Sequence, residues 1–157
     1  MPEVQVEEVP VDVNEVDVDQ LIADFEHQDL SDYNPDFKAI DEDVYRLRLV
    51  GTPKEFKGIG KNGKPWFRKS MAVAVVEGPN AGRRVFVNEF PNVFTRFARK
   101  VMDATGISQD ANETVSDFLT KVAGINDAVF LAKVEKFFDD YRQKDDNRVV
   151  VSSISAV

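Results

Sequence analysis

The stretch KEFKGIGKNGKPWFRK, residues 54–69, determines how the rest of the chain is arranged. It holds six cations against one acid, three glycines and three aromatic side chains. Apolar-rich segments lead into it at 44–50 and out of it at 71–76, which predicts a long β-hairpin with a flexible tip. Because cations neutralise phosphates and flat rings stack on bases, this tip suits a nucleic acid.

The composition excludes several kinds of site. The chain has 157 residues, enough for one domain with a tail, and no cysteine, so disulfides and thiolate metal sites are ruled out. Its single histidine, His27, lies in an acidic segment, so we expect no catalytic triad, no metal, no cofactor and no enzyme activity. No apolar run approaches the roughly 20 residues that span a bilayer, and the N-terminus is acidic where a signal peptide is basic. We expect a cytoplasmic protein without membrane contact.

The net charge of −8 averages two opposed parts of the chain. Residues 1–43 contain fifteen acids and one cation, whereas residues 44–100 contain thirteen cations and three acids. This asymmetry predicts a basic binding domain over residues 43–157, preceded by an acidic extension over residues 1–42.

The acidic extension is expected to be partly disordered. Residues 1–16 alternate valine with acids, but Pro10 and the high charge favour disorder, or ordering only on a partner. A short amphipathic helix follows, whose apolar side either docks on the domain or enters the groove of a partner protein. Its apolar residues are Val18, Leu21, Ile22 and Phe25.

Alternation predicts three strands, over residues 44–50, 66–76 and 83–90, each with one face in the core. The inward residues are expected to be Tyr45, Leu47, Leu49, Met71, Val73, Val75, Val85 and Val87. The opposite face then carries Arg46, Arg48, Trp66, Arg68, Ser70, Arg84, Phe86 and Asn88. A slip of one residue in the third strand would reverse its assignment.

Two helices and two further strands complete the prediction. Asn92 is expected to cap a helix that ends at Gly106, and a second helix, near 113–123, should end at Gly124. The sequence predicts a fourth strand over residues 128–138 and a fifth strand over residues 148–154. A polar loop is predicted between them, over residues 139–147. The five predicted strands indicate a mainly β fold, and the helices fall between the third and the fourth of them. This order is that of the OB-fold, a five-stranded Greek-key barrel. That fold binds single strands around strands 2 and 3 and with its 1–2 and 4–5 loops.

The predicted interface combines cations with exposed rings. Trp66 and Phe86 are expected to stack on bases, although Trp66 could instead pack along arginine stems. Phosphate contacts are expected from Arg46, Arg48, Lys57, Lys61, Lys64, Arg68 and Arg84. The loop between strands 4 and 5 is expected to assist with Phe137, Tyr141 and Arg142.

A phosphate-binding loop is the competing interpretation of the glycines. Gly58, Gly63 and Lys64 match the start of that motif, but Pro65 stands where the motif needs a serine or threonine and an amide donor. We therefore expect these glycines to let the hairpin tip turn.

The chain resembles the OB-fold single-stranded DNA-binding proteins of bacteriophages over residues 43 to about 154. The resemblance lies in YRLRL (45–49), GIGKNGKPW (58–66), VVEGPNAGRRVF (75–86), the helix that follows, and AVFLAK (128–133). It implies a replication or recombination accessory that coats single strands without sequence preference. Bacterial proteins of this class carry their acidic, partner-recruiting tip at the C-terminus, whereas the acids here lie in the N-terminal segment.

The expected function is sequence-independent binding of single-stranded DNA, with replication or recombination proteins as further partners of the acidic extension and a homo-oligomer left open. Two alternatives remain. One is a protein-interaction module that works through the acidic extension. The other is an RNA-binding OB-fold protein, because a 2′-hydroxyl contact cannot be deduced from a sequence.

Overall fold

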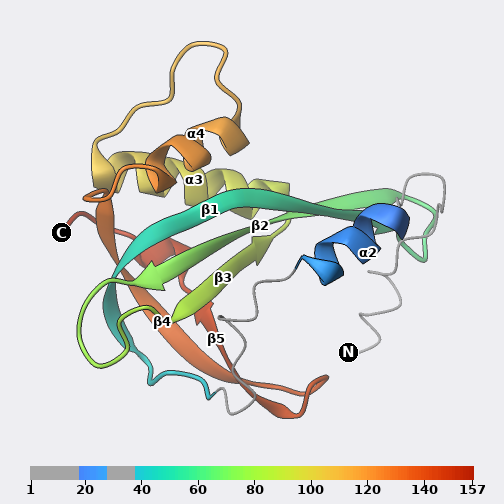
Figure 1. Ribbon diagram of the computed structural model, residues 1–157, viewed down its shortest axis with the longest axis horizontal. Coiled ribbons are helices and arrows are strands. Elements are labelled where there is room, and N and C mark those ends of the chain that lie inside the picture. The colour runs from blue at the N-terminus through green and yellow to red at the C-terminus, as the bar shows by residue number, and fades with distance from the viewer. Residues whose placement is uncertain (1–17, 28–37) are drawn as a thin grey trace. The chain divides into compact units, whose positions relative to one another are not determined.

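A computed structural model describes residues 18–27 and 38–157 (Figure 1). The prediction of disorder over residues 1–16 falls on residues outside these described ranges. The described chain falls into two compact units. One consists of Ala39–Phe56 and Phe67–Val157, and the other includes helix α2 (Val18–Glu26) and Lys57–Trp66.

The protein is mainly β, as predicted. Five antiparallel strands form one open sheet in the order β3-β2-β1-β4-β5. The strands are β1 (Asp43–Ile59), β2 (Pro65–Val75), β3 (Arg84–Glu89), β4 (Val129–Asp139) and β5 (Lys144–Val149). The two edge strands of this sheet, β3 and β5, also contact each other. The predicted hairpin is confirmed, with a tip that is shorter than residues 54–69 because both strands continue into that stretch.

One face of the sheet forms the core together with helices α3 (Pro91–Thr105) and α4 (Val115–Ala123) (Figure 1). The alternation predicted for the first three strands is confirmed, since Leu47, Met71 and Val73 are almost completely buried. The register of β3 is also the predicted one: Val85 and Val87 are buried, whereas Phe86 is 59% exposed. The face of these three strands that points away from the core therefore carries their arginines.

The helices end where the sequence predicts but begin differently. Gly106 ends α3 in the left-handed conformation (φ 75°), which glycine adopts without strain. The prediction that Asn92 caps α3 is wrong: Phe90 is the N-cap residue and Pro91 is the first helical residue, a position where its missing N–H costs nothing. Thr114 caps α4 by accepting a hydrogen bond from the Asp117 amide. Across residues 18–27 and 38–157, no helix combines the length and the apolar character needed to cross a membrane.

The prediction of a polar loop over residues 139–147 is wrong. Strands β4 and β5 continue to Asp139 and from Lys144, so only a short turn separates them. The Asp139 carboxylate accepts hydrogen bonds from the amides of Tyr141 and Arg142, at 3.0 and 3.3 Å, and so stabilises this turn.

The fifth strand also ends earlier than predicted. The chain leaves the sheet after Val149 and forms a 3-10 turn over Val151–Ser153. The Ser153 hydroxyl donates to the Val150 carbonyl at 2.6 Å and accepts from the Lys133 amide at 2.7 Å. Because serine side chains compete in this way for backbone groups, the β-branched run before it does not continue as a strand.

The Asn147 side chain links the lead-in to β1 with the β4–β5 hairpin. Ile40, N-terminal to the boundary predicted at residue 43, is 3% exposed and packs in the core. The Asn147 amide accepts from the Ile40 N–H (2.9 Å) and donates to the Ile40 carbonyl (3.0 Å) and to the Glu135 carbonyl (3.1 Å). Asn147, expected in a loop, therefore fastens the start of the domain.

Candidate nucleic-acid interface

The outward side of β1, β2 and β3, called here the outer face, has a row of small side chains along β2. Ser70, Ala72 and Ala74 alternate with the buried Met71, Val73 and Val75. Ser70 and Ala74 are only 8% exposed although they point away from the core, because the strands beside them carry longer side chains. A ligand on the outer face can therefore approach the backbone of β2 closely.

Larger side chains stand on both sides of this row. On β3, Phe86 lies opposite Ala72 and Arg84 lies opposite Ala74 in the antiparallel register. On β1, Arg46 and Arg48 alternate with the buried Leu47 and Leu49. Three of the predicted phosphate-binding residues and one predicted stacking ring thus share the outer face.

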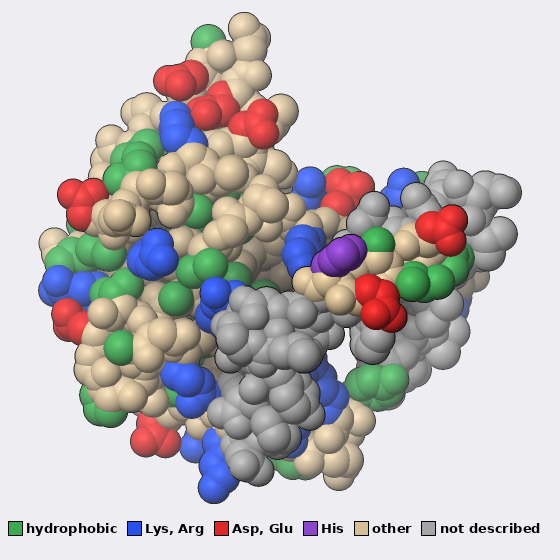
Figure 2. Space-filling view, viewed as in Figure 1, with side chains coloured by type: hydrophobic (Ala, Val, Ile, Leu, Met, Phe, Trp, Pro, Cys, Tyr) green, Lys and Arg blue, Asp and Glu red, His purple; other side chains and the backbone are tan. Residues whose placement is uncertain are grey.

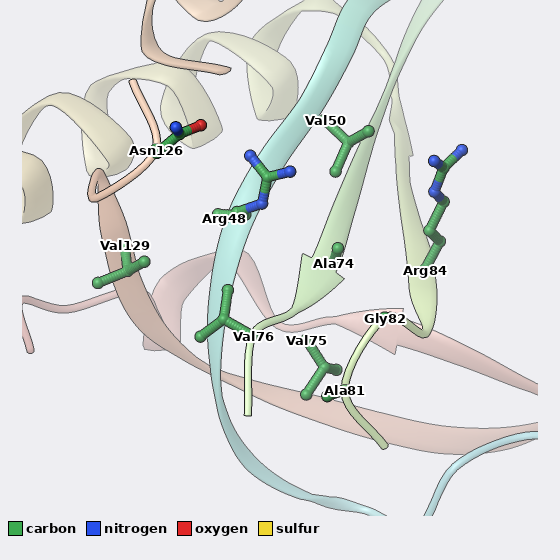
Figure 3. Close-up of a pocket in the computed structure, with 10 residues that line it drawn as sticks. All are labelled: Arg48, Val50, Ala74, Val75, Val76, Ala81, Gly82, Arg84, Asn126 and Val129. Carbon is green, nitrogen blue, oxygen red and sulfur yellow. The ribbon is translucent and has the colours of Figure 1, made fainter. Parts of the chain in front are cut away.

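A cavity of about 450 Å³ opens on the outer face (Figure 3). Three polar side chains line it, Arg48, Arg84 and Asn126, which come from β1, from β3 and from the turn before β4. The remaining lining is apolar or small and consists of Val50, Ala74, Val75, Val76, Ala81, Gly82 and Val129.

The arginines of the outer face differ in what they contact. The Arg46 Nε lies 3.8 Å from a Glu77 carboxylate oxygen and makes no hydrogen bond, although it is buried. The Arg48 side chain makes neither a hydrogen bond nor an ion pair with any residue in the described part of the chain. An anion would supply the acceptors that these two guanidinium groups lack.

Arg68 lies near the start of β2, close to an aromatic ring and to a carboxylate. Its guanidinium carbon is 5.7 Å from the centre of the Phe90 ring. Burial raises the pKa of the nearby Glu89, while the positive charges of Arg148 and Arg68 lower it. Arg68 is therefore engaged within the protein, and its predicted role at a phosphate stays a prediction.

Basic side chains gather over the strands of the larger unit in Figure 2. Acidic side chains gather on the same side around α4 and the loop before it. The Lys121 ammonium of α4 donates to a carboxylate oxygen of Glu113, in the loop before that helix, at 2.9 Å.

The hairpin tip presents three of the predicted lysines to solvent. Lys57, Lys61 and Lys64 are exposed, whereas Trp66 is half-buried. Gly63 adopts a positive φ of 78° and its amide donates to the Gly60 carbonyl at 2.9 Å, which closes the turn. Trp66 is thus neither sealed in the interior nor a fully open stacking surface.

The residues of the second predicted arm, at the β4–β5 turn, differ in what they contact. The Arg148 guanidinium lies 4.8 Å from the centre of the Phe137 ring and covers one of its faces. Arg142 pairs with Asp139 at 3.5 Å and with Asp146 at 3.9 Å. Of the three residues predicted here, Tyr141 and Arg142 are exposed, whereas Phe137 is half-buried.

Sequence reasoning missed the small residues and Asn126. The alternation of small and large apolar residues over 70–75 was visible in the sequence and marks a strand that a ligand can approach. Asn126 carries no such signal, because an asparagine after a helix-ending glycine is also typical of a turn. Its place in the cavity depends on the packing of the turn before β4 beside β1.

Comparison of the chain with models of protein families, with curated proteins and with solved structures finds no match in any of the three. Within the described ranges, no three histidine, aspartate or glutamate side chains gather in a way that could hold a metal ion. The function is therefore argued from the geometry of the outer face and the hairpin tip.

Proposed function

We propose that the chain is a non-enzymatic protein that binds single-stranded DNA without sequence preference. The observation that supports this best is the outer face itself: the exposed Phe86 ring stands beside Arg84 on β3, across a row of small residues from Arg48 on β1. A ring can stack only on a base that is free of its neighbours, and the arginines suit the phosphates of the same strand.

The architecture supports an OB-fold as the framework for this activity. The helices α3 and α4 lie between the third and fourth of five strands. The sheet is open between β3 and β5, but these edge strands contact each other. A five-stranded sheet bent until its edges meet corresponds to the partly open barrel of that fold, which binds oligonucleotides on the face around strands 2 and 3.

The test is a titration with single-stranded DNA, single-stranded RNA and duplex DNA at two salt concentrations. We expect single strands to bind more tightly than duplex, and the logarithm of the affinity to fall with the logarithm of salt by about 0.7 for each phosphate contacted. Absence of binding to every oligonucleotide at low salt would refute the proposal. Preference for RNA would instead assign the outer face to RNA.

Replacement of the ring on β3 tests the stacking contribution. Phe86→Ala should weaken binding of single-stranded DNA about 5- to 150-fold, because stacking on one base contributes about 1–3 kcal/mol. The ring contacts solvent rather than core, so the melting temperature should stay close to that of the wild type. Affinity is measured by fluorescence anisotropy with a labelled oligothymidylate.

Phe138→Ala is the matched control for this variant. Phe138 is 53% exposed, nearly as much as Phe86, but lies on β4 and points to the side opposite Phe137. It should leave the affinity unchanged. Equal losses in both variants would show that exposed rings bind oligonucleotides irrespective of position, and would remove the role given to the outer face.

A second candidate function is recruitment of a partner protein through the acidic extension. Helix α2 exposes Val18 and Ile22, which are one helical turn apart and are 56% and 54% exposed. An amphipathic helix with such a stripe can enter a groove of another protein. This candidate becomes the better one if the chain binds no oligonucleotide at low salt.

A further inference from the structure

Two polar side chains that line the cavity on the outer face make no hydrogen bond to the part of the chain that the structure describes. The first is Arg48, whose guanidinium contacts no acceptor there. The side-chain amide of Asn126 likewise takes part in no hydrogen bond within the described ranges. Both line the same cavity (Figure 3).

Asn126 is not needed by the turn in which it stands. Backbone groups hold that turn: the Ala128 amide donates to the Ile125 carbonyl at 3.1 Å, and the Val129 amide donates to the Asp127 carbonyl at 3.0 Å. An asparagine that stabilised the turn would accept one of these amides with its own side chain. The amide of Asn126 is therefore free to meet a ligand.

The size and lining of the cavity suit a flat heterocycle. Its volume of about 450 Å³ lies in the range of small-ligand sites, roughly 300–1,000 Å³. Val50, Ala74 and Val76 offer apolar surface, and the polar groups are few. Arg84 lies at the β3 side of the same cavity, where it suits the phosphate attached to a bound nucleoside.

We propose that this cavity receives one base of the bound single strand and prefers guanine. This inference rests on the proposed function and deepens it, because it adds one position of base preference to binding that is otherwise independent of sequence. Guanine presents two acceptors, N7 and O6, to which a guanidinium such as that of Arg48 donates two parallel hydrogen bonds. Its amino group can donate to the Asn126 carbonyl oxygen.

The other bases fit these two side chains less well. Adenine and cytosine turn an amino donor toward the position that Arg48 would occupy, and two donors cannot bond to each other. Thymine offers the O4 acceptor alone on that edge, beside a methyl group. On the edge that faces the major groove of a duplex, guanine alone presents two acceptors side by side.

The experiment compares four labelled oligonucleotides with the full-length protein by fluorescence anisotropy. One is an oligothymidylate of about 20 nucleotides, longer than the roughly 4–16 nucleotides that one OB-fold covers. In the others every fourth thymine is replaced by guanine, adenine or cytosine, so that each binding register can place the new base in the cavity. We expect the guanine oligonucleotide to bind about 5- to 150-fold more tightly than the other three, as one bidentate pair allows.

Two variants assign the preference to the cavity. Asn126→Ala and Arg48→Lys should each lower the ratio of the guanine affinity to the thymine affinity toward one, the second because lysine keeps the charge but cannot donate the parallel pair. Asn92→Ala, which removes an exposed amide from α3, is the control and should leave the ratio unchanged. Melting temperatures confirm that all variants are folded.

The outcomes separate this inference from the function on which it rests. If the oligothymidylate does not bind, the proposed function fails. If it binds and guanine brings no gain, the proposed function stands and the guanine cavity is refuted. A guanine preference that persists in Asn126→Ala and Arg48→Lys would likewise refute the cavity, because the preference would then arise elsewhere on the protein.

Discussion

A variant with Arg46, Arg48 and Arg84 replaced by alanine should bind single-stranded DNA at least about 100-fold more weakly than the wild type. A hydrogen bond to a charged group contributes about 1.5–3 kcal/mol, so the loss of three contacts has a large effect even if the contributions are not additive. The salt dependence should also become shallower, by about 2 in the logarithmic slope, because three phosphates are no longer neutralised.

A second triple variant controls for net charge. Replacement of Arg96, Arg99 and Lys100 by alanine removes the same charge from α3, where Arg99 pairs with Asp103 at 3.0 Å and the Lys100 ammonium reaches the Ser152 carbonyl at 3.4 Å. It should change the affinity only slightly and leave the salt slope in place. If both triple variants lose affinity to the same degree, binding follows overall charge and the outer face is not the interface.

The fold should tolerate the loss of Arg46 and Arg48. The Arg48 side chain makes no hydrogen bond in the described residues, and Arg46 makes only a long contact with Glu77. An ion pair at that distance on a partly exposed surface contributes little to the free energy of unfolding. A large fall in melting temperature would show instead that these side chains hold the sheet together.

The largest effect of a polar substitution on stability is expected at Asn147. Asn147→Ala removes three hydrogen bonds that fasten the backbone of Ile40 and Glu135, and should lower the free energy of unfolding by about 2–4 kcal/mol. The melting temperature should fall by roughly 5–15 °C. Thermal unfolding followed by circular dichroism measures this change.

The matched control for Asn147→Ala is again Asn92→Ala, since Asn92 is exposed and its side chain has no hydrogen-bond partner in the described residues. Its melting temperature should match the wild type or lie slightly above it, because alanine is the better helix former. If Asn147→Ala melts as the wild type does, the lead-in to β1 is not held by this side chain.

The inside and the outside of the first three strands could be predicted from the sequence because strand alternation is a local property. Val85 and Val87 could be assigned to the core, and Phe86 to solvent, once the pattern was matched to a pleated strand. The ends of the helices were equally predictable, because a glycine such as Gly106 stops a helix through its own backbone conformation.

The positions of Asn147 and Asn126 in the folded chain could not be predicted. Asn147 bonds to a residue 107 positions away, and no local pattern records such a partner. The prediction of a loop over 139–147 was wrong for a related reason: polar and charged residues are typical of loops, but here they form β5 and its turn once Asp139 satisfies the turn amides.

By itself, the sequence determined which residues of each strand face the core, where the helices end, and that cations and rings concentrate on the first hairpin and its neighbours. These properties depend on residue type and on spacing within one element. Only the tertiary structure decided that Arg48, Arg84 and Asn126 line one cavity, that Arg148 covers Phe137, and that Asn147 holds Ile40. The first and third of these juxtapositions join segments that are far apart in the chain, and the second depends on the register in which β5 pairs with β4, so none is fixed by a single segment.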